Sequence, residues 1–268
     1  MEKRIVCINW GTKYGAPYIN RLWAMIARNV TPPFSLTCYT DSAAGVRGEV
    51  RCLPLPPLEA VLRPGTPGIW PKARLWSETL EGLAGPVLFM DLDLVVTGDL
   101  DGFFDHGEPD DVILARNWNT PFERLGQTSI FRFPVGKLAP LKAAFLADPQ
   151  GIADAYRFEQ RFVTRNAPGG VTFWPYSWVQ NYRAQCLWPF PLNYVLDPRL
   201  PRGCKVVIFP GGLNPPDAIA GRRTGRDAVL PAGRHIARAF AKDRERGFLR
   251  HLRSFTRPSR WVAEHWRE

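Results

Sequence analysis

The sequence predicts an α/β fold with a mixed, mostly parallel central sheet and helices on both of its faces. Three observations support this fold class: short apolar runs of strand length, apolar residues at helical spacing between them, and Gly or Pro residues at the junctions. A chain of 268 residues can bury a full hydrophobic core as one α/β domain. We expect this single domain over residues 1–220 and a basic, aromatic-containing, helical tail over residues 221–268.

The first elements are predicted to be a strand, a loop and a helix. Residues Arg4–Ile8 form an apolar run, and the polar loop Asn9–Gly15 contains two glycines. Pro17 suits the first turn of a helix, in which apolar residues follow at helical spacing as far as Ile26. This order predicts that the loop lies over the carboxyl edge of the sheet, where open α/β sheets bind ligands.

The remaining elements are predicted from similar patterns. A loop rich in Pro and Gly is expected over residues 54–68, whereas the aromatic-rich region 173–191 has no clear period. The same reasoning predicts strands at 34–39, 50–53, 112–115, 130–133 and 205–209, and helices at 71–83, 137–146 and 159–165.

The most informative stretch is Val87–Val96, an apolar run interrupted by two aspartates. We expect a buried strand here, in which Asp91 and Asp93 point to the same side and Leu92 turns into the core. Two carboxylates on one face are costly to bury unless a cation lies between them. Mg²⁺ or Mn²⁺ is the natural candidate, because these ions take carboxylate ligands and then bridge to phosphate oxygens.

The positive charge is concentrated near the carboxyl end. Residues 221–268 contain 13 Lys and Arg against 5 Asp and Glu, and the whole chain has a net charge of +10. Phe240, Phe248, Leu252 and Phe255 are predicted to share one face of an amphipathic helix in this tail. Such a tail is either a solvated helix or a surface that docks on anionic membrane. No interleaved aromatic and basic sheet motif is present, so no nucleic-acid partner is expected.

Several features favour a cytoplasmic protein, peripheral on the inner face of the membrane if the tail docks there. No run of about eighteen apolar residues occurs, and the first apolar strand is too short for a signal peptide. The five cysteines are odd in number and include no Cys-x-x-Cys. We therefore expect buried, reduced thiols and neither disulfides nor a zinc site.

The residues 87–104 read Val-Leu-Phe-Met-Asp-Leu-Asp-Leu-Val-Val-x-Gly-Asp-Leu-Asp-x-Phe-Phe. This pattern resembles the metal-binding segment of glycosyltransferase family 8, the glycogenin-like and lipopolysaccharide-galactosyltransferase-like retaining enzymes, and the likeness extends over 1–216. The resemblance implies a GT-A fold, a Rossmann-like domain that binds nucleotide sugars. It also implies transfer of glucose or galactose from a UDP-sugar to a glycan or lipid-linked saccharide, with retention of configuration.

The resemblance also assigns roles to individual residues. Asp91 and Asp93 match the metal and nucleotide-sugar motif, and a cation bound there would neutralise the leaving diphosphate. Either Lys72 or Arg74 is expected to add a second positive contact. The other matched positions are Asn9, Thr12 and Tyr14 near the uracil, Arg74 at the donor, Gln127 at the donor sugar, and Glu159 and Gln160 at the acceptor side of the sugar. Asp93, Glu159 and Gln160 are the expected catalytic residues.

One motif of the family is altered in this chain. The family closes its donor site with His-Gly-x-Lys or His-Gly-Lys, in which the His is a metal ligand and the Lys holds the diphosphate. Here the corresponding residues are Pro210, Gly211, Gly212 and Leu213. This departure supports an alternative, a catalytically degenerate protein of the same fold that binds nucleotide sugars without turning them over.

A second alternative is a phosphatase of the haloacid dehalogenase type. The segment Asp91–Val96 also fits the nucleophile motif of that class, in which the first Asp attacks phosphate and the second acts as acid and base. That class carries the motif near its N-terminus, whereas some ninety residues precede it here. The later acidic pair, Asp110–Asp111, also lacks the apolar strand that should precede it, so this alternative is the weaker one.

Overall fold

The computed structural model describes residues 2–118, 120, 122–225, 227–241 and 247–268. These residues form two compact units. The N-terminal unit comprises Met1–Leu92 and Asp99–Tyr176, and the C-terminal unit comprises Asp93–Gly98 and Ser177–Glu268. The boundary at residue 220 was inferred from composition and stays a prediction.

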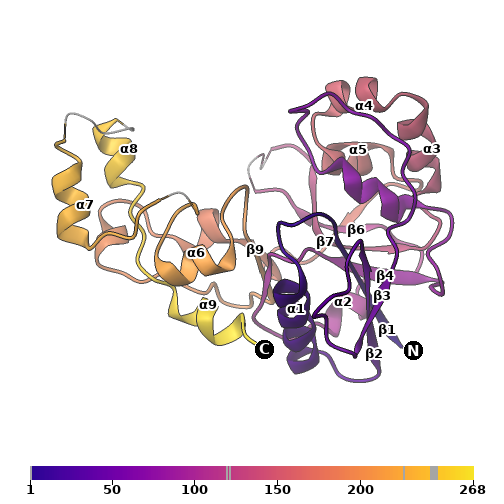
Figure 1. Ribbon diagram of the computed structural model, residues 1–268, viewed down its shortest axis with the longest axis horizontal. Coiled ribbons are helices and arrows are strands. Elements are labelled where there is room, and N and C mark those ends of the chain that lie inside the picture. Colours follow the sequence, from indigo (N-terminus) through magenta and orange to yellow (C-terminus); the bar gives the residue numbers. More distant parts are fainter. Residues whose placement is uncertain (1, 119, 121, 226, 242–246) are drawn as a thin grey trace. The chain divides into compact units, whose positions relative to one another are not determined.

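The N-terminal unit contains a seven-stranded sheet (Figure 1). Four neighbouring strands, β3-β2-β1-β4, run parallel to one another, and β7 is antiparallel to its neighbours β4 and β6. The prediction of a mixed, mostly parallel sheet is therefore confirmed. In spatial order the strands are β3 (Val50–Leu53), β2 (Phe34–Thr40), β1 (Lys3–Asn9), β4 (Pro86–Met90), β7 (Gly126–Pro134), β6 (Ile113–Arg116) and β8 (Thr172–Phe173).

The parallel strands end together at one edge of the sheet. Asn9 at the end of β1 pairs with Thr40 at the end of β2, and Tyr39 pairs with Leu53 at the end of β3. Because the carboxyl ends of these strands are level, the loops that follow them meet at the same edge. This is the edge at which the loop after β1 and the residue Asp91 lie.

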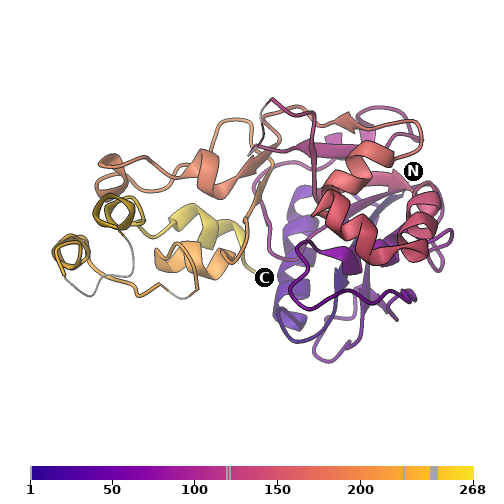
Figure 2. The ribbon, with the colours of Figure 1, turned by 90° about the horizontal axis from the view of Figure 1, so that it is seen from above.

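Aromatic packing builds the core on one face of this sheet. Trp70 stacks on Phe145 with ring centroids 4.9 Å apart, and Trp76 lies against Phe162 at 5.9 Å. These rings pack with strand residues such as Phe89 in one buried cluster. Helices α3–α5 cover this face, and α1 covers the other (Figure 1 and Figure 2). The helices are α1 (Ala16–Asn29), α2 (Gly102–Asp105), α3 (Ala139–Ala147), α4 (Pro149–Tyr156) and α5 (Glu159–Asn166).

The predicted helix at 71–83 is shorter in the structure and has a different geometry. A 3₁₀ helix, η1, runs from Trp70 to Trp76, and Ser77 after it is extended. Gly82 has φ 70°, a left-handed conformation that suits glycine, in the turn between the bridged residues Leu80 and Leu83. A 3₁₀ helix has about three residues per turn, so its side chains are distributed differently from those of an α-helix.

The predicted strand 87–96 is divided between the two units. β4 ends at Met90, Leu92 and Asp93 form a turn, and β5 (Val95–Val96) belongs to a second sheet. The strand alternation expected for Asp91 and Asp93 was therefore wrong, because a turn has replaced the pleat there. Leu92 is buried, as expected.

The C-terminal unit is made of short elements. Its three-stranded sheet has the order β5-β10-β9, and β9 leads directly into a π-helix. The other elements are β9 (Val179–Asn181), η2 (Tyr182–Cys186), η3 (Leu192–Tyr194), β10 (Val206–Ile208), α6 (Pro215–Ala220), α7 (Ala232–Arg238), α8 (Phe248–Leu252) and α9 (Arg260–His265).

The tail does not form the single amphipathic helix that was expected. Its described residues form the three short helices α7, α8 and α9. Phe240 and Phe255 lie beyond the ends of α7 and α8, because each of these helices ends within two turns. Residues 226 and 242–246 of the predicted tail lie outside the described residues. None of the helices formed by the described residues has both the length and the apolar character needed to traverse a lipid bilayer.

Candidate active site

Asp91 lies directly after β4 at the carboxyl edge of the sheet. Its backbone N–H donates a 2.8 Å hydrogen bond to the carbonyl of Ser129 on β7, which extends the pairing of the two strands by one residue. The side chain of Asp91 is 19% exposed. A central strand therefore presents this carboxylate at the position where α/β sheets bind ligands.

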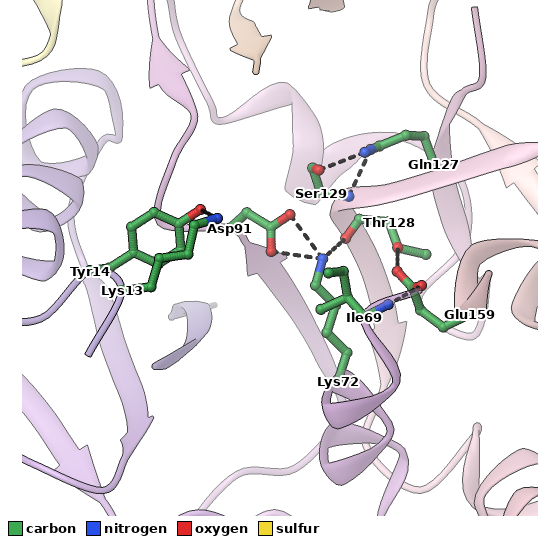
Figure 3. A network of polar contacts seen from close by, with 9 residues as sticks. All are labelled: Lys13, Tyr14, Ile69, Lys72, Asp91, Gln127, Thr128, Ser129 and Glu159. Atoms are coloured by element: carbon green, nitrogen blue, oxygen red, sulfur yellow. Dashed lines mark hydrogen bonds and ion pairs between the residues drawn. The ribbon is translucent and has the colours of Figure 1, made fainter. Parts of the chain in front are cut away.

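A buried lysine holds the Asp91 carboxylate. Lys72 Nζ lies 2.7 Å from Oδ1 and 2.8 Å from Oδ2 of Asp91, and it donates a further 3.3 Å hydrogen bond to the carbonyl of Thr128 (Figure 3). The Lys72 side chain is only 7% exposed. Removing one member of so buried a pair leaves an uncompensated charge, so the two residues depend on each other.

Hydrogen bonds through Thr128 link the Lys72–Asp91 pair to Glu159, the first residue of α5. Glu159 is buried; its Oε2 accepts a 2.9 Å hydrogen bond from the Ile69 backbone N–H, and its Oε1 accepts one of 3.2 Å from the Thr128 hydroxyl. A carboxylate in the first turn of a helix is also favoured by the helix dipole. Thr128 thus connects Glu159 to Lys72 and Asp91 (Figure 3).

Two further predicted residues lie beside this network. The side-chain amide of Gln127 donates to the Ser129 hydroxyl at 2.6 Å and accepts from the Ser129 N–H at 2.7 Å (Figure 3). Gln160 is half-buried and follows Glu159 in the first turn of α5, where its carbonyl accepts a 2.6 Å hydrogen bond from the Thr164 hydroxyl. Gln127 and Asp91 therefore both bind the backbone of Ser129, Gln127 at its N–H and Asp91 at its carbonyl.

The cation beside Asp91 is Lys72, whereas Arg74 contacts another part of the chain. Arg74 Nη1 donates a 2.6 Å hydrogen bond to the carbonyl of Pro56, in the loop after β3. Residues two positions apart point about 120° apart in a 3₁₀ helix and about 160° apart in an α-helix. Either helix sends Lys72 and Arg74 in different directions, so the sequence alone gave no means of ranking Lys72 first.

The loop after β1 is fixed to β2 by Asn9. Asn9 is buried; its Nδ2 donates a 3.2 Å hydrogen bond to the Thr40 hydroxyl, and its Oδ1 accepts one of 3.4 Å from the Gly15 N–H. Thr12 is exposed at the tip of the loop. The ring of Tyr14 lies 4.8 Å from that of Tyr18 on α1. Asn9 therefore holds the loop that carries Tyr14, and its contact with a donor stays a prediction.

The donor atoms present suit a hard divalent cation only in part. Among the described residues, no group of three or more His, Cys, Asp or Glu could hold a metal ion. Asp91 supplies carboxylate oxygens, however, and Mg²⁺ is commonly held by one or two carboxylates together with substrate phosphates. Asp93 belongs to the C-terminal unit, and its part in a metal site stays a prediction. The ligand type therefore fits Mg²⁺ or Mn²⁺, on condition that the substrate completes the coordination.

The residues that replace the closing family motif belong to the C-terminal unit. Pro210, Gly211 and Gly212 follow β10, and Gly211 adopts a left-handed φ of 68°. The nearest histidine in the later sequence, His235, has another role: its Nδ1 lies 2.8 Å from the Tyr194 hydroxyl, and its ring stacks on that of His251 at 4.1 Å. His235 is thus part of the packing around α7 and α8.

No known protein-family profile matches the sequence, and no curated protein matches it. Solved structures do match. A galactosyltransferase LgtC, in complex with donor and acceptor sugar analogs, is 14% identical and has a TM-score of 0.54, with 97% of this chain and 99% of that chain covered. The glycosyltransferase GlyE of Streptococcus pneumoniae TIGR4 is 12% identical and has a TM-score of 0.54, with 80% of this chain covered.

A third match is the bifunctional glycosyltransferase WbbM, at 14% identity and a TM-score of 0.52 over 80% of this chain. The chain spans 46% of the WbbM chain and 56% of the GlyE chain. At such low identity the matches are informative about the fold. They show that this chain has the GT-A glycosyltransferase fold that the Asp-x-Asp segment led us to expect.

Proposed function

We propose that this protein is a retaining glycosyltransferase that moves glucose or galactose from a UDP-sugar to a glycan or lipid-linked saccharide. The observation that carries the proposal is the Asp91 carboxylate at the end of a central strand of a GT-A fold, with the Lys72 ammonium beside it. This arrangement brings a buried ion pair to the edge of the sheet where a ligand would bind. A sugar nucleotide presents a diphosphate, which Lys72 can contact when a cation takes its place at Asp91.

The leaving diphosphate needs positive charge as the glycosidic bond lengthens. Lys72 supplies an ammonium group at the edge of the sheet, and we assign it to the developing negative charge once a cation has taken its place at Asp91. Asp91 and Asp93 would hold Mg²⁺ or Mn²⁺, which when bound supplies further charge neutralisation at the diphosphate. Arg74 is held at Pro56 and is left with no role at the diphosphate in this proposal.

The two residues that open α5 are assigned different roles. Both carboxylate oxygens of Glu159 accept hydrogen bonds from the chain, so Glu159 positions the first turn of the helix. Gln160 follows it, and we assign its side-chain amide to the sugar, where its dipole would stabilise the positive charge that develops at the anomeric carbon. Gln127 is assigned to the hydroxyl groups of the donor sugar.

The loop after β1 is assigned to the uracil. We assign the stacking of the base to the Tyr14 ring, over which Lys13 Nζ lies 4.3 Å from the centroid, and Asn9 and Thr12 lie in or next to the same loop. Stacking of a base on an aromatic side chain contributes about 1–3 kcal/mol per base in nucleic-acid complexes, a useful scale for Tyr14. Asn9 contributes through its hold on Gly15 rather than through a free amide.

The tail is assigned to the surface of an anionic membrane. On and next to α7 and α8, Ile236, Phe240, Phe248 and Leu249 are exposed, and the rings of Phe240 and Phe248 lie 5.1 Å apart. Residues 221–268 contain 13 cationic residues. Exposed aromatic side chains next to cations favour the interface of anionic lipid. Phe240→Ser should therefore lower co-sedimentation with anionic vesicles.

A degenerate nucleotide-sugar-binding protein is the second candidate. Two observations favour it: Pro210 and Gly212 stand where the related family has His and Lys, and Lys72 occupies both oxygens of Asp91. A protein of this kind would bind UDP and leave UDP-sugars intact. It differs from the first proposal in turnover and not in fold.

A panel of UDP-sugars tests the first proposal. The full chain with Mn²⁺ is expected to hydrolyse or transfer from UDP-glucose or UDP-galactose, and Asp93→Ala should abolish this activity. Asp110→Ala is the matched control, because its side chain is 76% exposed and it pairs with Lys137 on the surface. UDP binding without any turnover would support the degenerate protein. Normal turnover by Asp93→Ala would show that the site is wrongly assigned.

A further inference from the structure

Four arginines gather near the carboxyl ends of β6 and β8, in the N-terminal unit. Arg116 ends β6, Arg124 lies in the loop between β6 and β7, and Arg161 and Arg165 lie about one turn apart on α5. Glu123 pairs with two of them: its Oε2 lies 3.2 Å from Arg161 Nη2, and its Oε1 lies 2.9 Å from Arg165 Nη2. The group therefore carries more positive than negative charge.

Arg116 and Arg124, the arginine pair, lie against one aromatic ring. The guanidinium carbon of Arg116 is 5.4 Å from the centroid of Phe173, and that of Arg124 is 5.5 Å from it. A cation within about 6 Å of a ring centroid is attracted by the ring. Arg124 also donates a 2.9 Å hydrogen bond to the Val171 carbonyl, and Phe173 packs against the buried core cluster. These contacts hold both cations in place.

The arginine pair has donors to offer a ligand. Arg116 and Arg124 are exposed, and neither has an ion-pair partner among the residues that the structure describes. A guanidinium has five N–H donors, of which the Val171 carbonyl takes one from Arg124. Two like charges beside one ring repel each other, and an anion bound by both offsets that repulsion. Carboxylate and phosphate are the groups whose geometry matches the guanidinium fork.

The arginine pair shares an edge of the sheet with Asp91. β6 runs parallel to β4, since β7 between them is antiparallel to both. Neighbouring strands are about 4.8 Å apart, so the end of β6 lies about 10 Å from that of β4. Arg116 pairs with Gly126, the residue before Gln127. A saccharide that extends from the donor sugar in this direction therefore reaches Arg116.

This direction leads away from the part of the edge assigned to the uracil. In the order of the sheet, β1 and β2 lie on one side of β4, and β7, β6 and β8 lie on the other. The loop that carries Tyr14 follows β1, whereas Arg116 and Phe173 end β6 and β8. The nucleotide and the arginine pair thus occupy opposite sides of Asp91, which leaves the arginine pair to the acceptor.

We propose that the arginine pair binds an acidic group of the acceptor saccharide. The inference rests on the proposed function for the position of the donor sugar, and it adds the chemical class of the acceptor: a saccharide that carries a carboxylate or a phosphate. Arg161 and Arg165 stay paired with Glu123 and add positive charge nearby. A neutral acceptor binds more weakly, because it leaves the two cations without a counter-charge.

Three methyl glycosides test the inference by direct binding to the full chain at low salt. They are a β-glucuronide, which carries a carboxylate, a phosphorylated β-galactoside, and the neutral β-galactoside. Titrations followed by saturation-transfer NMR measure the dissociation constant of each. We expect the tighter-binding acidic glycoside to bind at least about tenfold more tightly than the neutral one, as hydrogen bonds to a charged group predict. The acid that binds more tightly distinguishes carboxylate from phosphate.

Variants separate forked recognition from general attraction of charge. Arg116→Gln should weaken binding of the tighter acidic glycoside by about tenfold and that of the neutral one by less than about twofold. Arg116→Lys keeps the charge and loses the fork, so it should recover only part of the loss. The double variant with Arg124→Gln should abolish the preference for acid. Arg63→Gln is the matched control, because Arg63 is 67% exposed and pairs with Asp154 on the surface.

The outcomes separate this inference from the proposed function. If an acidic glycoside binds through Arg116 and UDP-sugars are not turned over, the acidic-saccharide site stands and sugar transfer fails. If UDP-sugars are turned over but the neutral glycoside binds as tightly as the acidic ones, the inference is refuted and the donor site stands. Equal binding by Arg116→Gln and Arg63→Gln also refutes it. If no glycoside binds and Arg116→Gln lowers co-sedimentation with anionic vesicles, the arginine pair contacts lipid and the inference is refuted.

Discussion

The two units of this chain differ in the length of their elements. In the N-terminal unit, β1 and β2 each have seven residues and pair along their whole length. In the C-terminal unit, β5 has two residues, and β9 and β10 have three each. Longer paired strands bring more side chains into one core, as the cluster around Trp70 and Phe145 shows.

In the C-terminal unit, side-chain contacts join short elements that are far apart in the sequence. Tyr194 stacks on Phe255 with ring centroids 4.4 Å apart, and Tyr182 stacks on Phe209 at 4.8 Å. A capping box formed by Asn214 and Asp217 begins α6. The candidate site residues with described contacts to one another lie in the N-terminal unit, where strand ends hold them in place.

The largest expected effect tests the core of each unit. Phe145→Ala removes a fully buried ring that stacks on Trp70, and should lower the free energy of unfolding by about 3–5 kcal/mol. Phe255→Ala removes a half-buried ring and should cost about 1.5 kcal/mol or less. Urea denaturation measures both. Equal losses would contradict the difference between the two units.

The next effect concerns the buried ion pair. Lys72→Met leaves the Asp91 carboxylate without its cation and should cost about 3 kcal/mol, the lower end of the range for a broken buried pair because Asp91 is 19% exposed. The double variant Lys72→Met with Asp91→Asn should lose less than the sum of the single losses. Additive losses in thermal or urea unfolding would show that the two side chains are not coupled.

A smaller effect appears in the pH dependence of stability. Burial raises the pKa of Tyr39 from its ordinary value of 10 to about 12. The unfolded chain therefore loses the Tyr39 hydroxyl proton at a lower pH than the folded chain. The contribution of Tyr39 to the free energy of unfolding is complete below pH 10 and is lost as the pH rises from 10 to about 12. Tyr39→Phe should flatten this decline and have little effect at pH 7, because the Tyr39 hydroxyl has no hydrogen-bond partner among the described residues. If the free energy of unfolding of Tyr39→Phe falls between pH 9 and 12 as steeply as that of the wild-type chain, the prediction is contradicted.

The smallest effect distinguishes the two cations of η1. Arg74→Ala removes a hydrogen bond to the Pro56 carbonyl, so UDP affinity should change by no more than about twofold. Lys72→Met should weaken UDP binding far more. If calorimetry shows that Arg74→Ala lowers UDP affinity tenfold or more, a change of about 1.4 kcal/mol, Arg74 is the residue that contacts the donor.

Much of the N-terminal unit could be predicted because its sequence has clear periodicity. The strand at 4–8, the helix that begins near Pro17 and the strand at 34–39 each match an element of the structure within two residues. The Asp-x-Asp segment led to the GT-A fold, although no sequence pattern showed that β4 would end at Met90. A turn of this kind depends on the second sheet that receives Val95–Val96, and such pairing is not local in sequence.

The site was predicted less completely than the fold. Lys72 was placed behind Arg74, because which of the two cations meets Asp91 depends on how η1 packs against the sheet and not on a pattern in the sequence. The role of Thr128 in joining Lys72 to Glu159 was missed, since residues 72, 128 and 159 meet only through tertiary packing. Regions without period, such as 173–191, gave no prediction for β9 or the π-helix that follows it.

The most direct measurement is calorimetric titration of UDP into the full chain, with and without Mn²⁺. If the edge of the sheet at Asp91 and Lys72 binds a sugar nucleotide, UDP will bind in the presence of Mn²⁺. Asp91→Asn will weaken that binding by at least about tenfold, and Asp110→Asn will not. Equal UDP affinity in the wild-type chain and Asp91→Asn, or no UDP binding to the wild-type chain, would contradict the account.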